Sequence, residues 1–324
     1  MKQKQTILTG IKCTGVPHIG NYLGAIKPAI EKANASDTQS FFFLADYHAL
    51  NQIKDPKELA QSVKEIACTW LACGLDPKKT VFYRQSDIPE VFELSTILGN
   101  VTAKGLMNRA HSYKAAVQAN LEHGRDADDE INIGLFTYPI LQAADIILMD
   151  TNFVPVGADQ KQHIEMAGDI AKSFNAIYGK VLVVPKEIIK DDVGTIQGLD
   201  GRKMSKSYGN TIPLFCTEEE LLKHIKRIAT DSSSPIDEKP TSHLIFQLYK
   251  HFTGADLETK IGWGTAKEKL FHAMNAVITP MREKFNYLMA NFNEVEKILN
   301  DGAKSARQTA TATINRVRKA IGVG

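Results

Sequence analysis

Cysteine is scarce in this sequence, with four residues in 324, and none of the four belongs to a C-x-x-C pair. This spacing argues against a zinc site or an iron–sulfur cluster, and we expect reduced thiols at Cys13, Cys68, Cys73 and Cys216. No apolar run reaches the roughly 18 residues that a membrane span needs, and the first residues lack the apolar core of a signal peptide. The sequence therefore predicts a cytoplasmic protein.

Net charge is also small, +2 at neutral pH, so the whole chain is not a polycation that binds nucleic acid indiscriminately. The balance differs along the chain. Residues 203–324 hold 18 lysines and arginines against 13 acidic residues, and residues 1–202 hold 21 against 24. A mildly basic C-terminal part favours phosphate-rich partners, although a solvated surface explains the asymmetry equally well.

Short apolar runs alternate with helical patterns in the first part of the chain. Strands are expected at residues 6–11, 40–46, 80–87, 152–156 and 181–185. Several of these runs are continuously apolar, which is typical of parallel strands that are covered on both faces. The alternation predicts an α/β fold with a Rossmann-like doubly wound parallel sheet.

Capping signals mark several helix starts. Asp55, Pro56 and Glu58 supply an N-cap, a first-turn proline and a capping partner. Asp159 and Gln162 form a similar pair before an amphipathic stretch. A buried helix is expected over the apolar sequence TYPILQAADIILM.

Two domains are expected. Residues 1–212 contain the sheet pattern, interrupted by a polar helical insertion near 88–130, in which the segment 122–130 should be exposed. From Thr217, which is expected to cap a helix, residues 213–324 contain helical patterns only. We therefore expect an α/β domain followed by an all-helical domain.

The sequence PHIGN, at residues 17–21, lies where the first strand is expected to lead into a helix. Ligands of doubly wound sheets bind at such loops. Gly20 lets a ligand approach the backbone, and the N–H groups of a first helical turn attract anions, to which His18 and Asn21 can add donors. Taken alone, the pattern is weak and favours an ordinary loop whose histidine is satisfied by its neighbours.

A second polar segment, GRKMSKSYGN, places Lys203 and Lys206 among small, flexible residues. By itself it could be a solvated charged loop. H-I-G-N after the first strand and K-M-S-K-S, at 203–207, after the last strand form a far more specific pair. Together they resemble the two motifs of the class I aminoacyl-tRNA synthetases.

The resemblance implies that residues 1–212 activate an amino acid with ATP. The attacking carboxylate, with a pKa near ~3.5, is already ionised and needs no general base. The reaction needs positioning and positive charge on the phosphates. We expect His18 and Asn21 to hold ATP, and Lys203 and Lys206 to close over the pyrophosphate. Mg²⁺ would be bound through the ATP phosphates, with no dedicated protein metal site.

Within class I, the chain resembles the bacterial tryptophanyl-tRNA synthetases along nearly its whole length. The similarity is carried by ILTGI, GVPHIGNYLGAI, ADYHAL, TYPILQAADIIL, VPVGADQKQH and KMSKS. Asp145 lies among apolar residues and needs a donor, because burying an unpaired carboxylate costs several kcal/mol. A structural hydrogen bond would satisfy it. The resemblance implies instead that Asp145 accepts the indole N–H of tryptophan, which would exclude phenylalanine, while pocket shape excludes tyrosine.

The resemblance also assigns the rest of the site. Tyr138 and Gln160 would face the substrate's ammonium and carboxylate groups, and His48 and Gln142 would line the pocket, although each could be ordinary packing. The residues expected around ATP are Gly10, Lys12, Cys13, Thr14, Gly20, Asn21, Gly157, Ala158, Asp159, Ile196, Lys203, Met204, Ser205, Lys206 and Ser207.

Two positions depart from the family pattern. The loop after the first strand usually reads G-x-Q-P-[ST]-G, but here it reads GIKCTG. Lys12 thus places a cation where a neutral amide is usual, and we expect it to contact an ATP phosphate. Gln142 stands where many members have methionine, beside the expected indole position.

Partners follow from the resemblance as well. Residues 213–324 would bind the anticodon of tRNA(Trp), and the insertion near 88–130 would contribute to a homodimer. That insertion is too short for a separate editing domain. The candidate phosphate contacts are Lys223, Lys226, Arg227, Arg316, Arg318 and Lys319, although a solvated face explains any single one of them.

Three alternatives stay open at this stage. A tyrosyl-tRNA synthetase shares both motifs and the aspartate of the pocket helix. A small-molecule nucleotidyltransferase could use the same fold, but it would not need more than 100 residues of C-terminal helices. A catalytically silent, tRNA-binding paralogue is disfavoured by the intact His18, Asn21, Lys203 and Lys206.

Overall fold

A computed structural model describes residues 5–35, 38–157, 160–189 and 196–324. Five parallel strands form one sheet in the order β3-β2-β1-β4-β5. The chain starts in the middle of the sheet and winds outward in both directions, which confirms the predicted α/β doubly wound architecture. The strands are β1 (Thr6–Lys12), β2 (Gln39–Ala45), β3 (Thr80–Arg84), β4 (Phe153–Val156) and β5 (Lys186–Ile189).

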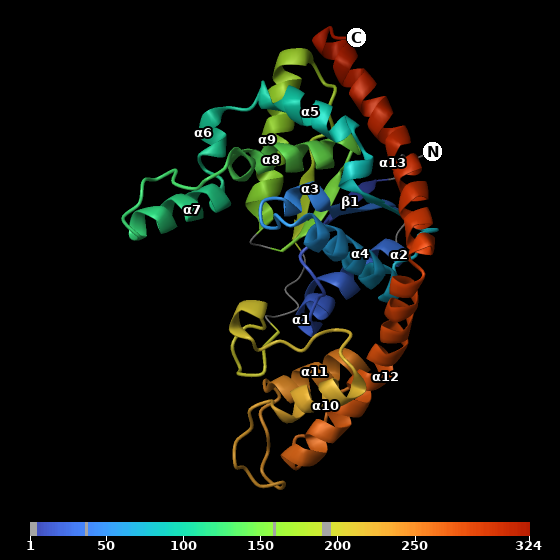
Figure 1. Ribbon diagram of the computed structural model, residues 1–324. Helices are drawn as coiled ribbons and strands as arrows, with labels where there is room; N and C mark the ends of the chain where they lie inside the picture. The colour runs from blue at the N-terminus through green and yellow to red at the C-terminus, as the bar shows by residue number, and fades with distance from the viewer. Residues whose placement is uncertain (1–4, 36–37, 158–159, 190–195) are drawn as a thin grey trace.

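Helices cover both faces of this sheet (Figure 1). Alternate residues of β2 therefore enter two different hydrophobic cores: Phe42 and Leu44 pack into one, and Phe41 and Phe43 into the other. This two-sided burial explains the continuous apolar run in the sequence. The helical elements up to the KMSKS segment are α1 (Ile19–Asn21), η1 (Tyr22–Ile26), α2 (Lys27–Ala35), α3 (Asp46–Ala49), α4 (Pro56–Ala72), η2 (Gln85–Asp87), α5 (Glu90–Gly99), α6 (Lys104–Met107), α7 (His111–Glu122), α8 (Ile133–Leu148), α9 (Lys161–Tyr178) and η4 (Lys206–Tyr208).

Most predicted helix starts are confirmed. Asp55 accepts hydrogen bonds from the N–H groups of the first turn of α4, and Pro56 is the first helical residue. Thr217 and Glu220 form a reciprocal capping box. Residues 122–130 are all exposed. The expected cap Asp159 lies outside the described residues, and its proposed partner Gln162 bonds instead to the backbone of residues 109 and 111.

The predicted last strand at 181–185 is wrong, because the sheet ends instead with β5, a few residues later. The apolar run packs against α9 without entering the ladder. Its backbone is satisfied by one side chain: the Asn175 amide accepts from the N–H groups of Val181 and Leu182 and donates to the carbonyl of Leu182. A run of apolar residues indicates that a segment is buried, but it does not show that the segment pairs with a neighbouring strand.

The C-terminal helices are α10 (Glu218–Lys226), α11 (Leu244–Thr253), α12 (Trp263–Ala290) and α13 (Phe292–Ile321). The first three form a group beside the sheet-containing part, and α13 runs back along that part (Figure 1). Ala303, Ala306 and Ala310 of α13 belong to the hydrophobic core on one face of the sheet. None of the described helices is long and apolar enough to cross a membrane.

Candidate functional site

The turn after β1 forms a capping box at the start of α1. The Asn21 N–H donates to His18 Nδ1 (3.3 Å), and the His18 N–H donates to Asn21 Oδ1 (3.1 Å). Because Nδ1 accepts, the neutral ring carries its proton on Nε2. Burial, followed by the nearby charge of Lys206, lowers the pKa of His18 to about 4. His18 is therefore a neutral hydrogen-bond donor at neutral pH.

The KMSKS segment docks directly on this turn. The Gly20 N–H points at the sulfur of Met204 (3.3 Å), and the Lys206 ammonium donates to the carbonyl oxygen of Thr14 (3.1 Å). Just beyond the segment, the Ile19 N–H donates to the carbonyl of Ile212 (2.9 Å). The two predicted motifs are therefore in direct contact, although Gly20 and Met204 are 184 positions apart in the sequence.

Asn210 shapes the lysine-bearing loop, and sequence reasoning missed it. Its amide accepts from the Ser205 N–H (2.8 Å) and donates to Asp200 (2.7 Å) and to the carbonyl of Lys203 (3.1 Å). A side chain at position 198 would collide with this amide, because a Cβ built on Gly198 lies 2.3 Å from it. One buried amide thus holds the backbone on both sides of the loop while Lys203 and Lys206 stay exposed.

The residues expected around ATP differ in how far their side chains are exposed. Lys12 and Thr14 are exposed, whereas Cys13 is fully buried and its thiol donates to the carbonyl of Ile11. Burial, with a smaller effect of nearby Asp46, raises the pKa of the Cys13 thiol to about 12. Only the backbone of Cys13 can therefore face a nucleotide.

Other residues expected around ATP are spread between loop surface and core. Gly10 and Gly157 are exposed, and Ile196 and Met204 are buried. The hydroxyls of Ser205 and Ser207 bond to each other (2.8 Å) on the loop surface. The expected contacts Ala158 and Asp159 lie outside the described residues.

Asp145 of α8 is only 2% exposed, and it has two donors. His48 Nε2 donates to Oδ2 (3.0 Å), and the Gln85 amide nitrogen donates to both carboxylate oxygens (2.9 Å each). Burial raises the pKa of Asp145 above its usual value, and the bonds from His48 and Gln85 offset only part of this rise. Asp145 and His48, both expected in the tryptophan pocket, are thus in direct contact at the carboxyl edge of the sheet, and Gln85 joins them.

A second chain of polar side chains contains Tyr138 and Gln160. His163 Nδ1 donates to Gln160 Oε1 (2.8 Å), so its Nε2 accepts from the Tyr138 hydroxyl (2.5 Å). Ser112, on the inserted helix α7, bonds to the same hydroxyl (3.1 Å). The Tyr138 ring lies at right angles to His48, with ring centroids 6.4 Å apart. This chain therefore lies next to the Asp145 cluster.

Gln142 is half-buried on α8, three residues before Asp145. No group of three His, Cys, Asp or Glu side chains that could hold a metal ion is found among the described residues. The side chains that contact the predicted site residues and that sequence reasoning missed are Gln85, Ser112, His163 and Asn210. His163 and Asn210 lie in the quoted segments VPVGADQKQH and GRKMSKSYGN without having been singled out there, and nothing in the sequence sets Gln85 apart from a solvated amide.

Comparison with known proteins agrees with this geometry. The family model described as tRNA synthetases class I (W and Y) matches residues 1–279. A tryptophan–tRNA ligase of Xylella fastidiosa is 50% identical over 328 residues, which cover 98% of this chain and 75% of that protein. One from Neisseria meningitidis is 48% identical over 330 residues, covering 99% of this chain and 98% of that protein.

Solved structures give the same result. The tryptophanyl-tRNA synthetase of Campylobacter jejuni, complexed with ADP and tryptophan, superposes with a TM-score of 0.87 at 39% identity, covering 98% of this chain and 100% of that one. The tyrosyl-tRNA synthetase of Archaeoglobus fulgidus superposes with a TM-score of 0.65 at 18% identity, which shows a shared fold alone. The chain therefore belongs to the class I tRNA synthetases and, within them, to the bacterial-type tryptophan–tRNA ligases, which are ATP-dependent ligases.

Proposed function

We propose that this chain activates L-tryptophan with ATP, forming tryptophanyl-adenylate and pyrophosphate, and then transfers tryptophan to tRNA(Trp). The observation that carries the proposal is the docking of Lys206 and Met204 on the turn that bears His18. Asp145 lies at the same carboxyl edge of the sheet, through its bonds to His48 and Gln85, which follow β2 and β3. Nucleotide and amino acid would thus meet at this edge.

In the first step, a carboxylate oxygen of tryptophan attacks the α-phosphorus of ATP, and the bond from that phosphorus to the pyrophosphate oxygen breaks. The carboxylate is ionised at neutral pH, so no protein base takes a proton. Catalysis then depends on positive charge and donors around the phosphates. His18 Nε2–H would donate there, Asn21 would keep the ring in place, and Lys203 and Lys206 would neutralise the leaving pyrophosphate.

Magnesium would accompany ATP and would supply further positive charge to the phosphates. We infer that the phosphates and water provide its ligands, because Mg²⁺ sheds water reluctantly and takes few protein oxygens. Lys206 would exchange the carbonyl of Thr14 for a phosphate oxygen when the nucleotide binds. The exposed Lys12, at the end of β1, would add a phosphate contact that a neutral amide cannot supply.

On the amino-acid side, Asp145 would accept the indole N–H. A site with a buried carboxylate discriminates strongly against a substrate that lacks the donor, since the carboxylate is then left unpaired. Tyr138 would accept from the ammonium group, and Gln160 would donate to the carboxylate. Gln142 and His48 would line the pocket.

We further propose the division into a catalytic domain at 1–212, with its helical insertion near 88–130, and an anticodon-binding helical domain at 213–324. Arg316 and Arg318 form ion pairs with Asp150 and Glu93. We therefore assign phosphate contacts first to candidates such as Lys226. The homodimer and the cytoplasmic location stay predictions.

The deciding experiment is ATP–pyrophosphate exchange measured with each standard amino acid. We expect exchange with tryptophan, followed by charging of tRNA(Trp) in the complete reaction. Exchange with tyrosine alone would make the chain a tyrosyl enzyme. Binding of tRNA without any exchange would favour the silent paralogue.

A further inference from the structure

Gln85 is a fully buried polar residue for which the proposed reaction has no role. It follows β3 at the start of η2, and both ends of its amide are bonded. The nitrogen donates to Asp145 Oδ1 and Oδ2 (2.9 Å each), and the oxygen accepts from the Tyr47 N–H (3.2 Å). One side chain therefore connects α8, which carries Asp145, to α3, which carries His48.

This contact limits how the carboxylate of Asp145 can turn. A carboxylate that recognises an N–H must present a lone pair in a fixed direction, and a recognition group is only as accurate as the side chains that support it. His48 touches Oδ2 alone, whereas Gln85 spans both oxygens. Rotation of the carboxylate would therefore disturb both bonds to Gln85 as well as the bond to His48.

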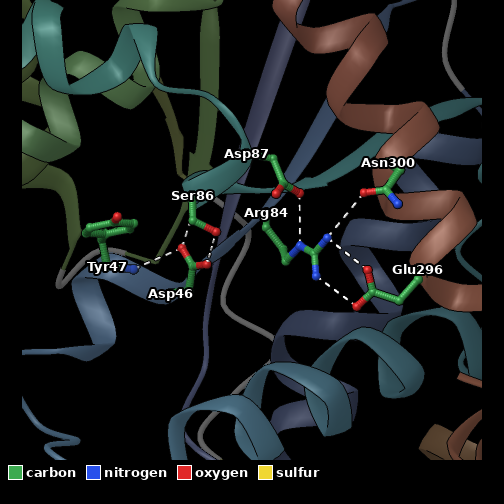
Figure 2. A network of polar contacts seen from close by, with 7 residues as sticks. All are labelled: Asp46, Tyr47, Arg84, Ser86, Asp87, Glu296 and Asn300. Carbon is green, nitrogen blue, oxygen red and sulfur yellow. Dashed lines mark hydrogen bonds and ion pairs between the residues drawn. The ribbon is translucent and has the colours of Figure 1, made fainter. Parts of the chain in front are cut away.

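The residue before Gln85 is anchored to the C-terminal helix (Figure 2). The Arg84 guanidinium donates to both oxygens of Glu296 (2.8 and 3.0 Å), to Asn300 (3.3 Å) and to Asp87 (2.9 Å). The two-pronged pairing with Glu296 fixes direction as well as distance. The end of β3 therefore keeps its position relative to α13.

The residue after Gln85 is anchored to α3. The N–H and hydroxyl groups of Ser86 both donate to Asp46, and Asp46 also accepts from the Tyr47 N–H (3.0 Å), as Figure 2 shows. Asp46 is the first residue of α3, the helix that also carries His48. Gln85 is thus held between two fixed neighbours, and the hydrogen bonds from its amide fix the orientation of the Asp145 carboxylate.

We propose that Gln85 is a positioning residue for indole recognition, kept in register by the pairing of Arg84 with Glu296 of α13. The inference rests on the proposed role of Asp145 as acceptor of the indole N–H. On this proposal, the preference for substrates that carry the indole N–H depends on a side chain that does not touch the substrate.

The test replaces Gln85 by methionine, which keeps the length but removes the amide. ATP–pyrophosphate exchange gives kcat/KM for tryptophan and for the analogue 3-benzothienylalanine, in which sulfur replaces the indole N–H. We expect the ratio of the two values to fall by about tenfold in Gln85→Met, because the carboxylate is no longer aimed. The KM for ATP should not change. Both substrates are measured on one preparation, so loss of folded protein cancels in the ratio.

Gln118→Met is the matched control, since Gln118 also donates to a carboxylate, that of Glu122, but on the exposed surface of α7. It should keep the wild-type ratio. Should Gln85→Met not fold, Gln85→Asn is measured with the same expectation, because its amide is retained but is too short to span both oxygens.

Asp145→Asn separates this inference from the proposed function. If it leaves the ratio unchanged, the role of Asp145 itself is wrong. If it lowers the ratio and the Gln85 variant does not, the inference on Gln85 is overturned. Glu296→Gln should lower the ratio by about twofold, since one prong of the pairing with Arg84 survives. Glu294→Gln serves as its control, and equal ratios in these two variants would refute the role of Arg84.

Discussion

Lys206 donates from its ammonium group to the carbonyl oxygen of Thr14 across 3.1 Å, and the two residues are 192 positions apart in the sequence. Gly15, next to Thr14, has a φ of +75°, a backbone conformation that favours glycine. The lysine is exposed, so this contact holds the loop over the turn without burying the charge. A phosphate oxygen would be a stronger acceptor than a neutral carbonyl.

Replacing Lys206 by alanine should therefore abolish most of the first chemical step. We expect ATP–pyrophosphate exchange to fall by about 10² or more, because a charge that stabilises the leaving group is lost. The affinity for tryptophan in the absence of ATP, measured by calorimetry, should not change. Lys172→Ala, on the exposed face of α9, is the control. Undiminished exchange would instead revive a silent, RNA-binding role.

Lys12 is the residue that sets this chain apart from the usual family loop. Lys12→Gln restores the neutral amide, and we expect the KM for ATP to rise about threefold as one partly screened phosphate contact is lost. Steady-state exchange at several ATP concentrations measures the change. An unchanged KM would show that the side chain stays in solvent.

The pKa of His18 makes a prediction about stability. Its folded value, about 4, lies below the ordinary 6.5, so between these pH values the unfolded chain binds a proton that the folded chain does not. The contribution of His18 is complete above pH 6.5 and is lost as the pH falls toward 4. In His18→Asn, which keeps a helix-capping side chain, the loss of unfolding free energy over this range should be about 2 kcal/mol smaller than in wild type. Urea unfolding at several pH values measures it, and parallel curves would contradict the assignment.

Gly302 marks where α13 presses on the sheet. A Cβ at this position would lie 1.9 Å from the backbone oxygen of Phe82 in β3. Gly302→Ala should therefore lower the free energy of unfolding by about 3 kcal/mol, as helix and strand are forced apart. Gly264→Ala, in α12, meets nothing within 4 Å and should raise stability by up to about 1 kcal/mol. Similar effects of the two changes in denaturant unfolding would rule out the close contact.

The strand and helix order could be read from the sequence because it depends on local patterns. Continuous apolar runs such as residues 40–46 identify strands that are buried on both faces, and Asp55 with Pro56 identifies a helix start within three residues. The strand at 181–185 was misplaced because this apolar run is buried without pairing, and its first two residues bond to the Asn175 amide of the preceding helix.

The sequence by itself determined the fold class, the two motif loops and the family. Each of these depends on residues that are close together in the sequence or on short, complete motifs. Only the tertiary structure decided the partners of these residues: that Gln85 and His48 both hold Asp145, that His163 orients Tyr138, and that α13 is anchored to β3. These contacts join segments tens to hundreds of residues apart. Any exposed amide or histidine has the same local pattern, and only the folded chain shows which of them is buried against a carboxylate.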